Sequence, residues 1–211
     1  MREYTKELSV VALRNHPETN IIRVQLRKHP MLQGMFDADL PLLEHEFEIA
    51  DAAKGESLLD QGVRDMEQYF ILEGVLKRVV SNAEGKEMIL RFAAEGEMET
   101  SYAAWRQKTP TPYSIVCVTK ARVAKVPMPF WVDFIGRHPK FKESFEFEVM
   151  QLMSEVMAHT ITLHLLDAPG RVHRFERKHP DLVDRIPQKQ LAAYLNLSAE
   201  TLSRLRKSGK I

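Results

Sequence analysis

The sequence predicts an α+β protein with an antiparallel β-rich half, one long helix and a small helical C-terminal part. Three observations lead to this fold class. Between Lys54 and Ala124, short strand-like runs are separated by glycines at intervals of 7 to 12 residues, which is typical of an antiparallel sandwich or barrel. From Pro139 onward, apolar residues recur with helical spacing. The stretch that begins at Asp167 contains short helical patterns joined by turn signals.

Composition is typical of a soluble globular protein, because 44% of the residues are apolar and 28% are charged. Cys117 is the only cysteine in the sequence, so an intrachain disulfide is excluded and a reducing compartment is predicted. The longest apolar runs fall well short of the ~20 residues that span a bilayer, and the first residues carry no apolar signal-peptide core. We therefore expect a cytoplasmic protein of bacterial type without membrane association.

Charge is distributed unevenly along the chain. The net charge is +1, but residues 167–211 contain ten Lys or Arg against five Asp or Glu, and the remaining residues contain twenty against twenty-four. A basic C-terminal part on an acidic body is expected where a small module approaches phosphate groups.

The N-terminal half is expected to contain a helical arm, residues 1–29, and a β-rich domain, residues 30–137. Gly85 lies in a hairpin-turn signal, because glycine adopts positive φ without strain. The strand-like runs of this domain are Tyr69–Leu72, Val75–Val80, Met88–Phe92 and Tyr113–Val118.

Residues 138–166 are expected to form a dimerisation helix with two apolar stripes. The first follows the alternating steps of a coiled-coil seam, and it is predicted to form a homodimer interface. Its members are Phe145, Val149, Leu152, Val156, His159 and Leu163. The second stripe, Met150, Met153 and Met157, is predicted to pack against the β domain. The alternative is a core helix of a monomer.

Residues 167–211 carry the pattern of a helix-turn-helix. Asp167 is a good N-cap for a helix that stops before Pro180, and Pro187 can begin the next one. Asn196 then occupies a turn position that needs positive φ, and Ser198 is a natural N-cap for the last helix. An ordinary helical hairpin is the alternative, but it does not explain the polar outward face of that last helix.

This outward face predicts sequence-specific binding to double-stranded DNA. Arg204 is placed to donate to guanine and Glu200 to accept from cytosine, while Ser203 is near enough to contact a thymine or adenine edge. A two-fold dimer would place two such helices on an inverted repeat. The residues predicted to contact phosphates are Gln188, Ser198, Thr201 and Lys207.

From about Leu32 to Lys207 the chain resembles the Crp/Fnr family of bacterial transcription regulators. The resemblance rests on Lys54-Gly55-Glu56, Tyr69-Phe70-Ile71-Leu72-Glu73-Gly74, Gly85-Lys86-Glu87, Leu165-Leu166-Asp167-Ala168-Pro169 and Glu200-Thr201-Leu202-Ser203-Arg204. It implies a cyclic-nucleotide-binding-type β-roll (a double-stranded β-helix) for the effector domain, a dimer helix and a DNA-binding domain. It also implies a small-molecule effector, which the sequence does not identify, and RNA polymerase as a partner.

The last helix resembles the Fnr branch, which implies TTGA-type half-sites. Two departures from the family are visible, one in the residues that would bind an effector or a cofactor and one at the C-terminal end. The stretches 97–102 and 109–114 offer no arginine for a cyclic phosphate, and Glu97 and Glu99 would repel one, so cyclic AMP is not expected. The N-terminal cysteines of iron-sulfur members are absent, which excludes that cluster. Most of the C-terminal β-hairpin wing of many relatives is also missing.

Five residues near the cassette are the candidate lining of an effector pocket, with an ordinary core role as the alternative. They are Thr100, Ser101, Tyr102, Trp105 and Tyr113. No catalytic or metal-binding residue is predicted. A cupin-type enzyme needs two or three clustered histidines, whereas residues 31–136 contain His45 alone, and no Gly-x-Ser-x-Gly elbow is present. Two other readings remain open: a regulatory module that acts on a protein partner, and a regulator that needs no ligand.

Overall fold

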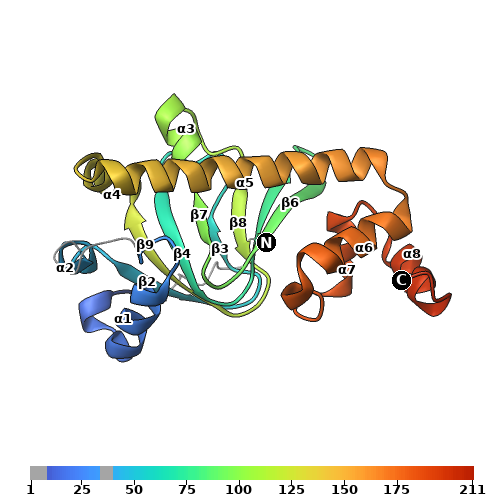
Figure 1. Cartoon of the computed structure of the whole chain (residues 1–211), viewed down its shortest axis with the longest axis horizontal. Helices are drawn as coiled ribbons and strands as arrows, with labels where there is room; N and C mark the ends of the chain where they lie inside the picture. The colour runs from blue at the N-terminus through green and yellow to red at the C-terminus, as the bar shows by residue number, and fades with distance from the viewer. Residues whose placement is uncertain (1–8, 34–39) are drawn as a thin grey trace.

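The structure is a computed structural model that describes residues 9–33 and 40–211. Two antiparallel sheets form a β-roll, and the long helix α5 (Pro139–Leu165) crosses it (Figure 1). Three further α-helices lie beneath the far end of α5 (Figure 1). The α+β class with a β-roll followed by helices is therefore confirmed.

The two sheets contain nine strands among the described residues. The first sheet has the order β1 (Ser9–Ala12), β2 (Glu48–Ala52), β9 (Ala121–Pro127), β4 (Glu67–Glu73) and β7 (Met98–Thr100). The second has the order β3 (Ser57–Leu59), β8 (Ser114–Cys117), β5 (Leu76–Ser81) and β6 (Glu87–Ala93). The four strand-like runs in the sequence correspond to β4, β5, β6 and β8.

The sheets bury apolar side chains between them. Ile71, Leu76, Ile115 and Val123 are almost fully buried in one cluster that joins the two sheets. Because side chains alternate across a strand, the other face of these strands carries either exposed polar residues or a second set of buried side chains. The core of the roll is thus built from short alternating strands.

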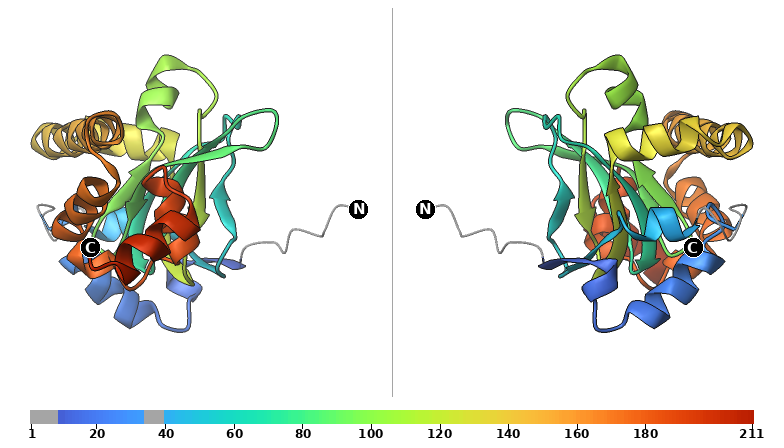
Figure 2. Two further views of the ribbon diagram at one scale, coloured as in Figure 1. Left: turned by 90° about the vertical axis from the view of Figure 1, so that its right-hand side faces the viewer. Right: turned by 90° about the vertical axis from the view of Figure 1, so that its left-hand side faces the viewer.

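Four short α-helices of the described residues surround the roll. They are α1 (Thr19–Lys28), α2 (Leu40–Glu44), α3 (Tyr102–Gln107) and α4 (Met128–Gly136). Helices α1 and α3 lie on opposite sides of the sheets (Figure 2). An aromatic cluster joins the first sheet to α4 and α5, with Trp131 in edge contact with Phe70 and Phe145 at ring-centroid distances of 5.2 and 5.3 Å. No helix within residues 9–33 and 40–211 is long and apolar enough to cross a membrane.

The N-terminal arm is not uniformly helical. Ser9–Ala12 forms β1, which pairs antiparallel with β2, and only Thr19–Lys28 is α-helical. The two adjacent valines of β1 favour a strand because β-branched side chains are restricted in a helix. Residues 1–8 of the predicted arm lie outside the described residues.

The two stripes of α5 face the opposite way from the prediction. Phe145 and Leu152 are buried within this chain, at 0% and 5% exposure, and Val149 packs against the aromatic cluster. Met150 and Met157 are 61% and 62% exposed. Heptad spacing identifies an apolar stripe but not its partner, so the predicted dimer seam is in fact the stripe that holds α5 to its own domain.

The other predicted seam residues also face their own chain or lie at its edge. The His159 ring stacks on Tyr194 of the same chain with centroids 3.7 Å apart. Val156 and Leu163 are half-buried. The methionine stripe, predicted to face the β domain, includes Met153 at 50% exposure. Of the two stripes, the methionine stripe is the one left open to solvent.

The C-terminal unit, residues 168–211, has the helices and caps that its sequence predicts. Its helices are α6 (Ala168–Lys178), the 3-10 turn Pro180–Leu182, α7 (Gln188–Tyr194) and α8 (Ala199–Lys207). Asp167 accepts a hydrogen bond from the Gly170 N–H at 2.9 Å, and Ser198 accepts one from the Thr201 N–H at 3.1 Å. Asn196 has φ of 54° in the turn between α7 and α8.

We predict that replacing Gly74, in the turn between β4 and β5, strongly lowers the stability of the fold. Its φ is +94°, and an added Cβ would lie 2.7 Å from the Ala121 Cα. Gly74→Ala should lower the free energy of unfolding by about 3 kcal/mol, because left-handed strain and a backbone clash add together. Gly85→Ala is the control: φ is +78° with nothing near the added Cβ, so only about 1 kcal/mol of strain is expected. Equal losses in urea unfolding would contradict this reading.

Candidate functional site

The exposed face of α8 presents the residues predicted to read bases. Leu202 and Leu205 turn into the core of the C-terminal unit, which leaves Glu200 and Arg204 exposed and Ser203 half-buried. Hydrogen bonds from the Glu200 backbone N–H and from Ser198 lower the pKa of the Glu200 carboxyl. That carboxylate is therefore a hydrogen-bond acceptor at neutral pH, next to the donors of Arg204.

The predicted phosphate contacts lie around this face. Gln188, at the start of α7, and Lys207, in the last turn of α8, are exposed. The hydroxyls of Ser198 and Thr201 hydrogen-bond to each other at 3.1 Å. Because the Ser198 hydroxyl already caps α8, its first role is structural, whereas Gln188 and Lys207 are free to reach a ligand.

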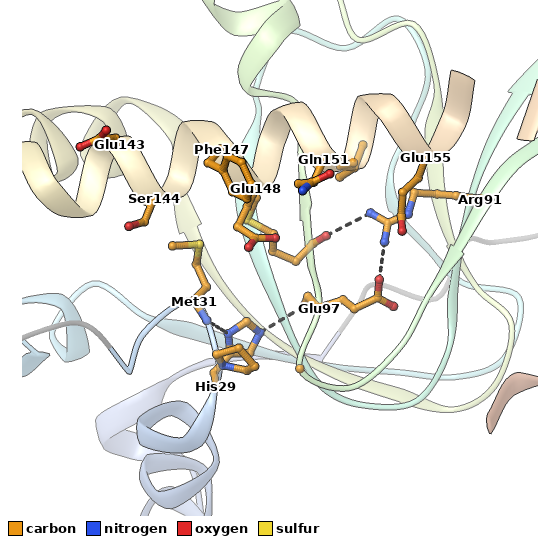
Figure 3. A pocket seen from close by; sticks show the side chains of 14 residues that line it. His29, Met31, Arg91, Glu97, Glu143, Ser144, Phe147, Glu148, Gln151 and Glu155 are labelled. Atoms are coloured by element: carbon orange, nitrogen blue, oxygen red, sulfur yellow. Dashed lines mark hydrogen bonds and ion pairs between the residues drawn. The ribbon is translucent and has the colours of Figure 1, made fainter. Parts of the chain in front are cut away.

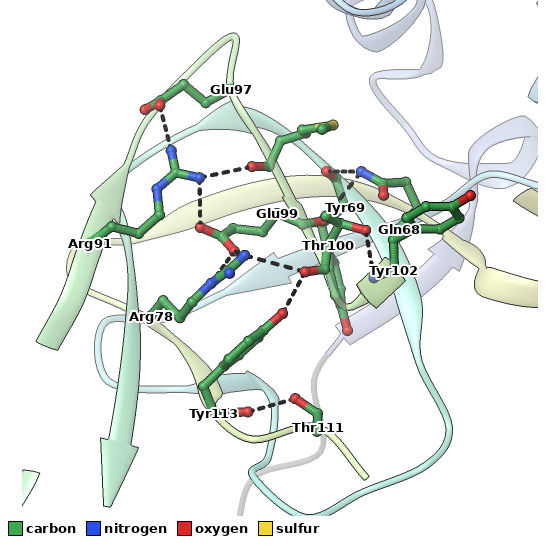
Figure 4. Close-up of polar contacts among 11 residues, drawn as sticks. Gln68, Tyr69, Arg78, Arg91, Glu97, Glu99, Thr100, Tyr102, Thr111 and Tyr113 are labelled. Atoms are coloured by element: carbon green, nitrogen blue, oxygen red, sulfur yellow. Dashed lines mark hydrogen bonds and ion pairs between the residues drawn. The ribbon is translucent and has the colours of Figure 1, made fainter. Parts of the chain in front are cut away.

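The interior of the β-roll holds a buried ion network (Figure 4). Arg78 from β5 donates to Glu99 from β7 through Nε at 3.0 Å and also through Nη2. Arg91 from β6 lies 3.3 Å from the other Glu99 oxygen and donates to Glu97 at 2.6 Å. Arg78 is 2% exposed and Glu99 is fully buried. The network thus balances two guanidinium groups against two carboxylates.

The structure divides the five predicted effector-pocket residues into two groups. Thr100, Ser101 and Tyr113 lie near the ion network. The Tyr113 hydroxyl donates to the Thr100 carbonyl at 2.6 Å, and the Arg78 guanidinium lies 4.1 Å from the centre of the Tyr113 ring. Tyr102 and Trp105, on α3, face α5 and the aromatic cluster instead; the Tyr102 hydroxyl donates to Glu146 at 2.7 Å.

The search of the sequence for an arginine that could bind an anion missed two arginines in the interior of this domain. It considered the cassette stretches alone, whereas Arg78 and Arg91 reach the interior from neighbouring strands. The alternation of side chains along β5 could have revealed that Arg78 points inward. Leu76 and Arg78 are two residues apart, so their side chains lie on the same face of the strand. Glu99, whose carboxylate was expected to repel a cyclic phosphate, pairs with both of these arginines instead.

The C-terminal unit docks on β6 of the same chain. Phe92 contacts Phe175 and Tyr194, with centroids 6.4 and 5.1 Å away. A bidentate ion pair between Arg185 and Glu95, at 2.6 and 2.8 Å, lies beside this contact. Aromatic packing and a bidentate guanidinium pair are both directional interactions, so together they hold the C-terminal unit in one orientation on β6.

His159 joins α5 to the same unit. Its Nε2 lies 3.0 Å from the Tyr194 carbonyl, while its ring stacks on the tyrosine. Burial lowers the pKa of His159 to about 4, and the cationic side chains of Lys178 and Arg174 act in the same direction. The imidazole is therefore neutral at physiological pH and donates to the carbonyl.

Residues 50–138 match the family model of the cyclic nucleotide-binding domain. These residues form a domain of the cyclic nucleotide-binding type. The comparison with curated proteins gave no match. Cys117 is the only cysteine of the chain, and the described part holds no group of three or more His, Cys, Asp or Glu residues that could bind a metal ion.

Solved structures with the same fold extend the likeness beyond the cyclic nucleotide-binding-type domain. A transcriptional regulator assigned to the Crp/Fnr family from Eubacterium rectale has a TM-score of 0.68, with 14% identity over 85% of each chain. The c-di-GMP-responsive regulator CLP of Xanthomonas campestris has a TM-score of 0.67 (13% identity; 82% of this chain and 92% of CLP). FixK2 of Bradyrhizobium japonicum has a TM-score of 0.66 (16% identity; 76% and 85%). At these identities the likeness is one of fold.

We predict that acid loosens the docking of the C-terminal unit. The lowered pKa of His159 means that the free ring takes up a proton below its ordinary value near 6.5, whereas the docked ring does so only near pH 4. Stability is therefore complete above pH 6.5 and falls as the pH drops toward 4, by about 2 kcal/mol for this partly buried group. Amide hydrogen exchange of α7 at pH 7 and pH 5 measures the change.

The matched variants are His159→Phe and His164→Phe. The first keeps a ring against Tyr194 but cannot be protonated, so the pH dependence should flatten. His164 is exposed on the same helix, and its replacement should leave the dependence unchanged. His179, which also has a pKa lowered by burial, accounts for any slope that remains. An unchanged slope in His159→Phe would contradict the assignment.

Proposed function

We propose that this chain is a sequence-specific DNA-binding transcription regulator of the Crp/Fnr type, not an enzyme, and that it acts in the cytoplasm as a homodimer. The observation that carries the proposal is the exposed face of α8, with Glu200, Ser203 and Arg204 on a capped helix that follows α7 through a tight turn. This is the arrangement of a helix-turn-helix. The fold of the regulators named above supports it.

In this proposal, α8 enters the major groove and reads base edges. Arg204 donates to guanine O6 and N7, Glu200 accepts from cytosine N4, and Ser203 contacts an adjacent thymine or adenine. A TTGA-type half-site provides such edges. Gln188, Thr201 and Lys207 hold phosphates and set the register without reading sequence. The charges of residues 167–211, ten basic against five acidic, favour the same approach to DNA.

The dimer is proposed to form through the open stripe of α5. Phe147, Met150, Met157, Ile161 and Leu165 are large apolar side chains that are each at least 50% exposed. Their spacing of three, seven, four and four residues keeps them on one side of the helix. A large exposed apolar stripe on a soluble protein marks an interaction site. Half-sites one turn of B-DNA apart, about 34 Å, would require the two α8 helices of this dimer to lie at the same spacing.

The domain division follows from this assignment. Residues 30–137 are proposed as the effector domain, 138–166 as the dimerisation helix and 167–211 as the DNA-binding domain. Cyclic AMP is not the expected effector, because Glu99 already occupies both Arg78 and Arg91, and displacing it would leave a buried carboxylate unpaired. Because Glu99 already pairs with both arginines, we favour either a regulator that needs no ligand inside the roll or an effector that binds elsewhere. RNA polymerase is the proposed protein partner.

We predict different losses when α8 residues that read bases or hold phosphates are truncated. Arg204→Ala should cost about 1–3 kcal/mol per half-site and relax the preference at one base pair. Lys207→Ala should weaken specific and random duplexes alike, and lower the slope of log K against log salt by about one unit per half-site. Titrations of inverted-repeat and scrambled duplexes at several salt concentrations separate these effects. An unchanged ratio of specific to random affinity in Arg204→Ala would refute the assignment of α8.

We also predict that Met157→Glu dissociates the dimer. Two stripes that face each other would bury a pair of like charges at this position, which raises the dissociation constant by about two orders of magnitude or more. Met88→Glu is the control, because Met88 on β6 is a methionine of similar exposure, 54% against 62%, far from the stripe. Analytical ultracentrifugation over a concentration series measures both variants. A monomer in the parent protein, or a dimer unaffected by Met157→Glu, would remove this stripe from the interface.

A further inference from the structure

The C-terminal end of α7 is closed by side chains that belong to two other helices. The last carbonyls of a helix have no partner within it, so they need donors from elsewhere. The backbone serves one of them, because the Leu197 N–H donates to the Ala192 carbonyl at 2.9 Å. The next carbonyls accept from side chains outside α7, and they belong to Tyr194, Leu195 and Asn196. These three residues form the turn that leads into α8.

Arg171 of α6 supplies two of these contacts. Its Nη1 donates to the Leu195 carbonyl at 3.2 Å and lies 3.5 Å from the Asn196 carbonyl. Its Nε donates to the Leu166 carbonyl at 2.9 Å, and Leu166 is the extended residue that follows α5, with ψ of 146°. One planar guanidinium therefore joins the end of α5 to the turn before α8. The compact ammonium group of a lysine cannot reproduce this geometry.

The chemistry of these contacts suits a residue that holds a turn. The acceptors of Arg171 are backbone carbonyls, and a cation at the C-terminal end of a helix is favoured by the helix dipole. The turn contains Asn196 in the left-handed conformation, with φ of 54°. Such a conformation persists only where the surrounding contacts fix it. The guanidinium of Arg171 is one of those contacts.

The other contacts between α5 and the C-terminal unit end before Asn196. Figure 3 shows Glu155 on the side of α5 that faces Arg91, and Glu155 also pairs with Lys178 at the end of α6 at 3.1 Å. The Lys178 and Glu155 side chains are 42% and 40% exposed, and an exposed pair contributes little. His159 holds the Tyr194 carbonyl. Arg171 carries the connection two residues further along the turn.

We propose that Arg171 is a positioning residue, which sets where α8 lies relative to α5 and therefore which half-site separation the protein recognises. The inference rests on the proposed DNA-binding function and dimer. On an inverted repeat, the two α8 helices of a dimer must match the separation of the half-sites. One inserted base pair shifts a half-site by about 3.4 Å and rotates it by about 35°. Because Arg171 lies on α6, its loss relaxes the preference for spacing and leaves the base preference of each half-site intact.

Titrations of three duplexes test the proposal. They are the inverted repeat that the parent protein binds best, the same repeat with two inserted base pairs, and a single half-site. The insertion should weaken the parent about tenfold or more, and Arg171→Gln and Arg171→Lys only about threefold or less, with little change on the single half-site. Arg171→Lys keeps the charge, so its salt slope should equal that of the parent, whereas a mere phosphate contact would also keep the spacing preference in this variant.

Arg177→Gln is the matched control for these titrations. It removes an exposed arginine from the same helix and should leave the preference for spacing unchanged. Parent-like spacing preference in both Arg171 variants would overturn the proposal. Loss of single half-site binding in both variants would also overturn it, because Arg171 would then be needed for the fold of α8 and not for its placement.

A distance measurement without DNA separates this proposal from the proposed function. Cys117 is buried, so spin labels attach to cysteines introduced at two exposed positions, Lys86→Cys and Lys210→Cys. Dipolar spectroscopy on labelled chains diluted with unlabelled protein reports the distance from the β-roll to the end of α8. The distance distribution should broaden in Arg171→Lys but not in Arg177→Gln. An unchanged distribution in both Arg171 variants would refute the positioning role. A broadened one, in a protein whose parent form binds no specific DNA, would support the placement of α8 by Arg171 and refute the proposed function alone.

Discussion

The pairing of Arg78 and Arg91 with Glu99 is the interaction on which the rest of the β-roll depends. The arginines belong to β5 and β6 in one sheet, and Glu99 belongs to β7 in the other. A buried charge is tolerated only where its partner is held in place, so the network fixes the separation and register of the two sheets near their open end. Removing Glu99 alone would leave the buried Arg78 without a carboxylate partner and Arg91 with Glu97 only, which is far more damaging than losing an exposed ion pair.

Strand β6 connects this interior to the C-terminal unit. Arg91 points inward to Glu99, and its neighbour Phe92 points outward to Phe175 and Tyr194, as alternation along a strand requires. Three residues further on, Glu95 binds Arg185. The orientation of α8 is therefore set by the strand that also carries half of the ion network. A change in the packing of β6 would reach the C-terminal unit through a continuous set of contacts.

Local signals in the sequence were sufficient for much of the fold. The N-caps Asp167 and Ser198, the positive φ of Asn196 and the glycine rhythm of the strands each depend on a few adjacent residues, and the structure contains all of them. The inner and outer stripes of α5 were assigned the wrong way round, because both are apolar and period alone does not identify their partners. The pairing of Arg78 with Glu99 was missed for a related reason: it joins residues 21 positions apart on strands of different sheets.

The corrected faces of α5 give one helix three separate tasks. Its inner face, with Phe145 and Leu152, binds the helix to its own β-roll, and His159 binds it to the C-terminal unit. Its outer stripe, with Met150 and Met157, is the proposed contact with a second copy. Because a helix of this length is held along one whole side, it cannot move relative to the roll without breaking packed contacts. A ligand or partner that shifts α5 must therefore move the roll contacts, the dimer stripe and the position of α8 together, which makes the helix the element through which control of DNA binding would act.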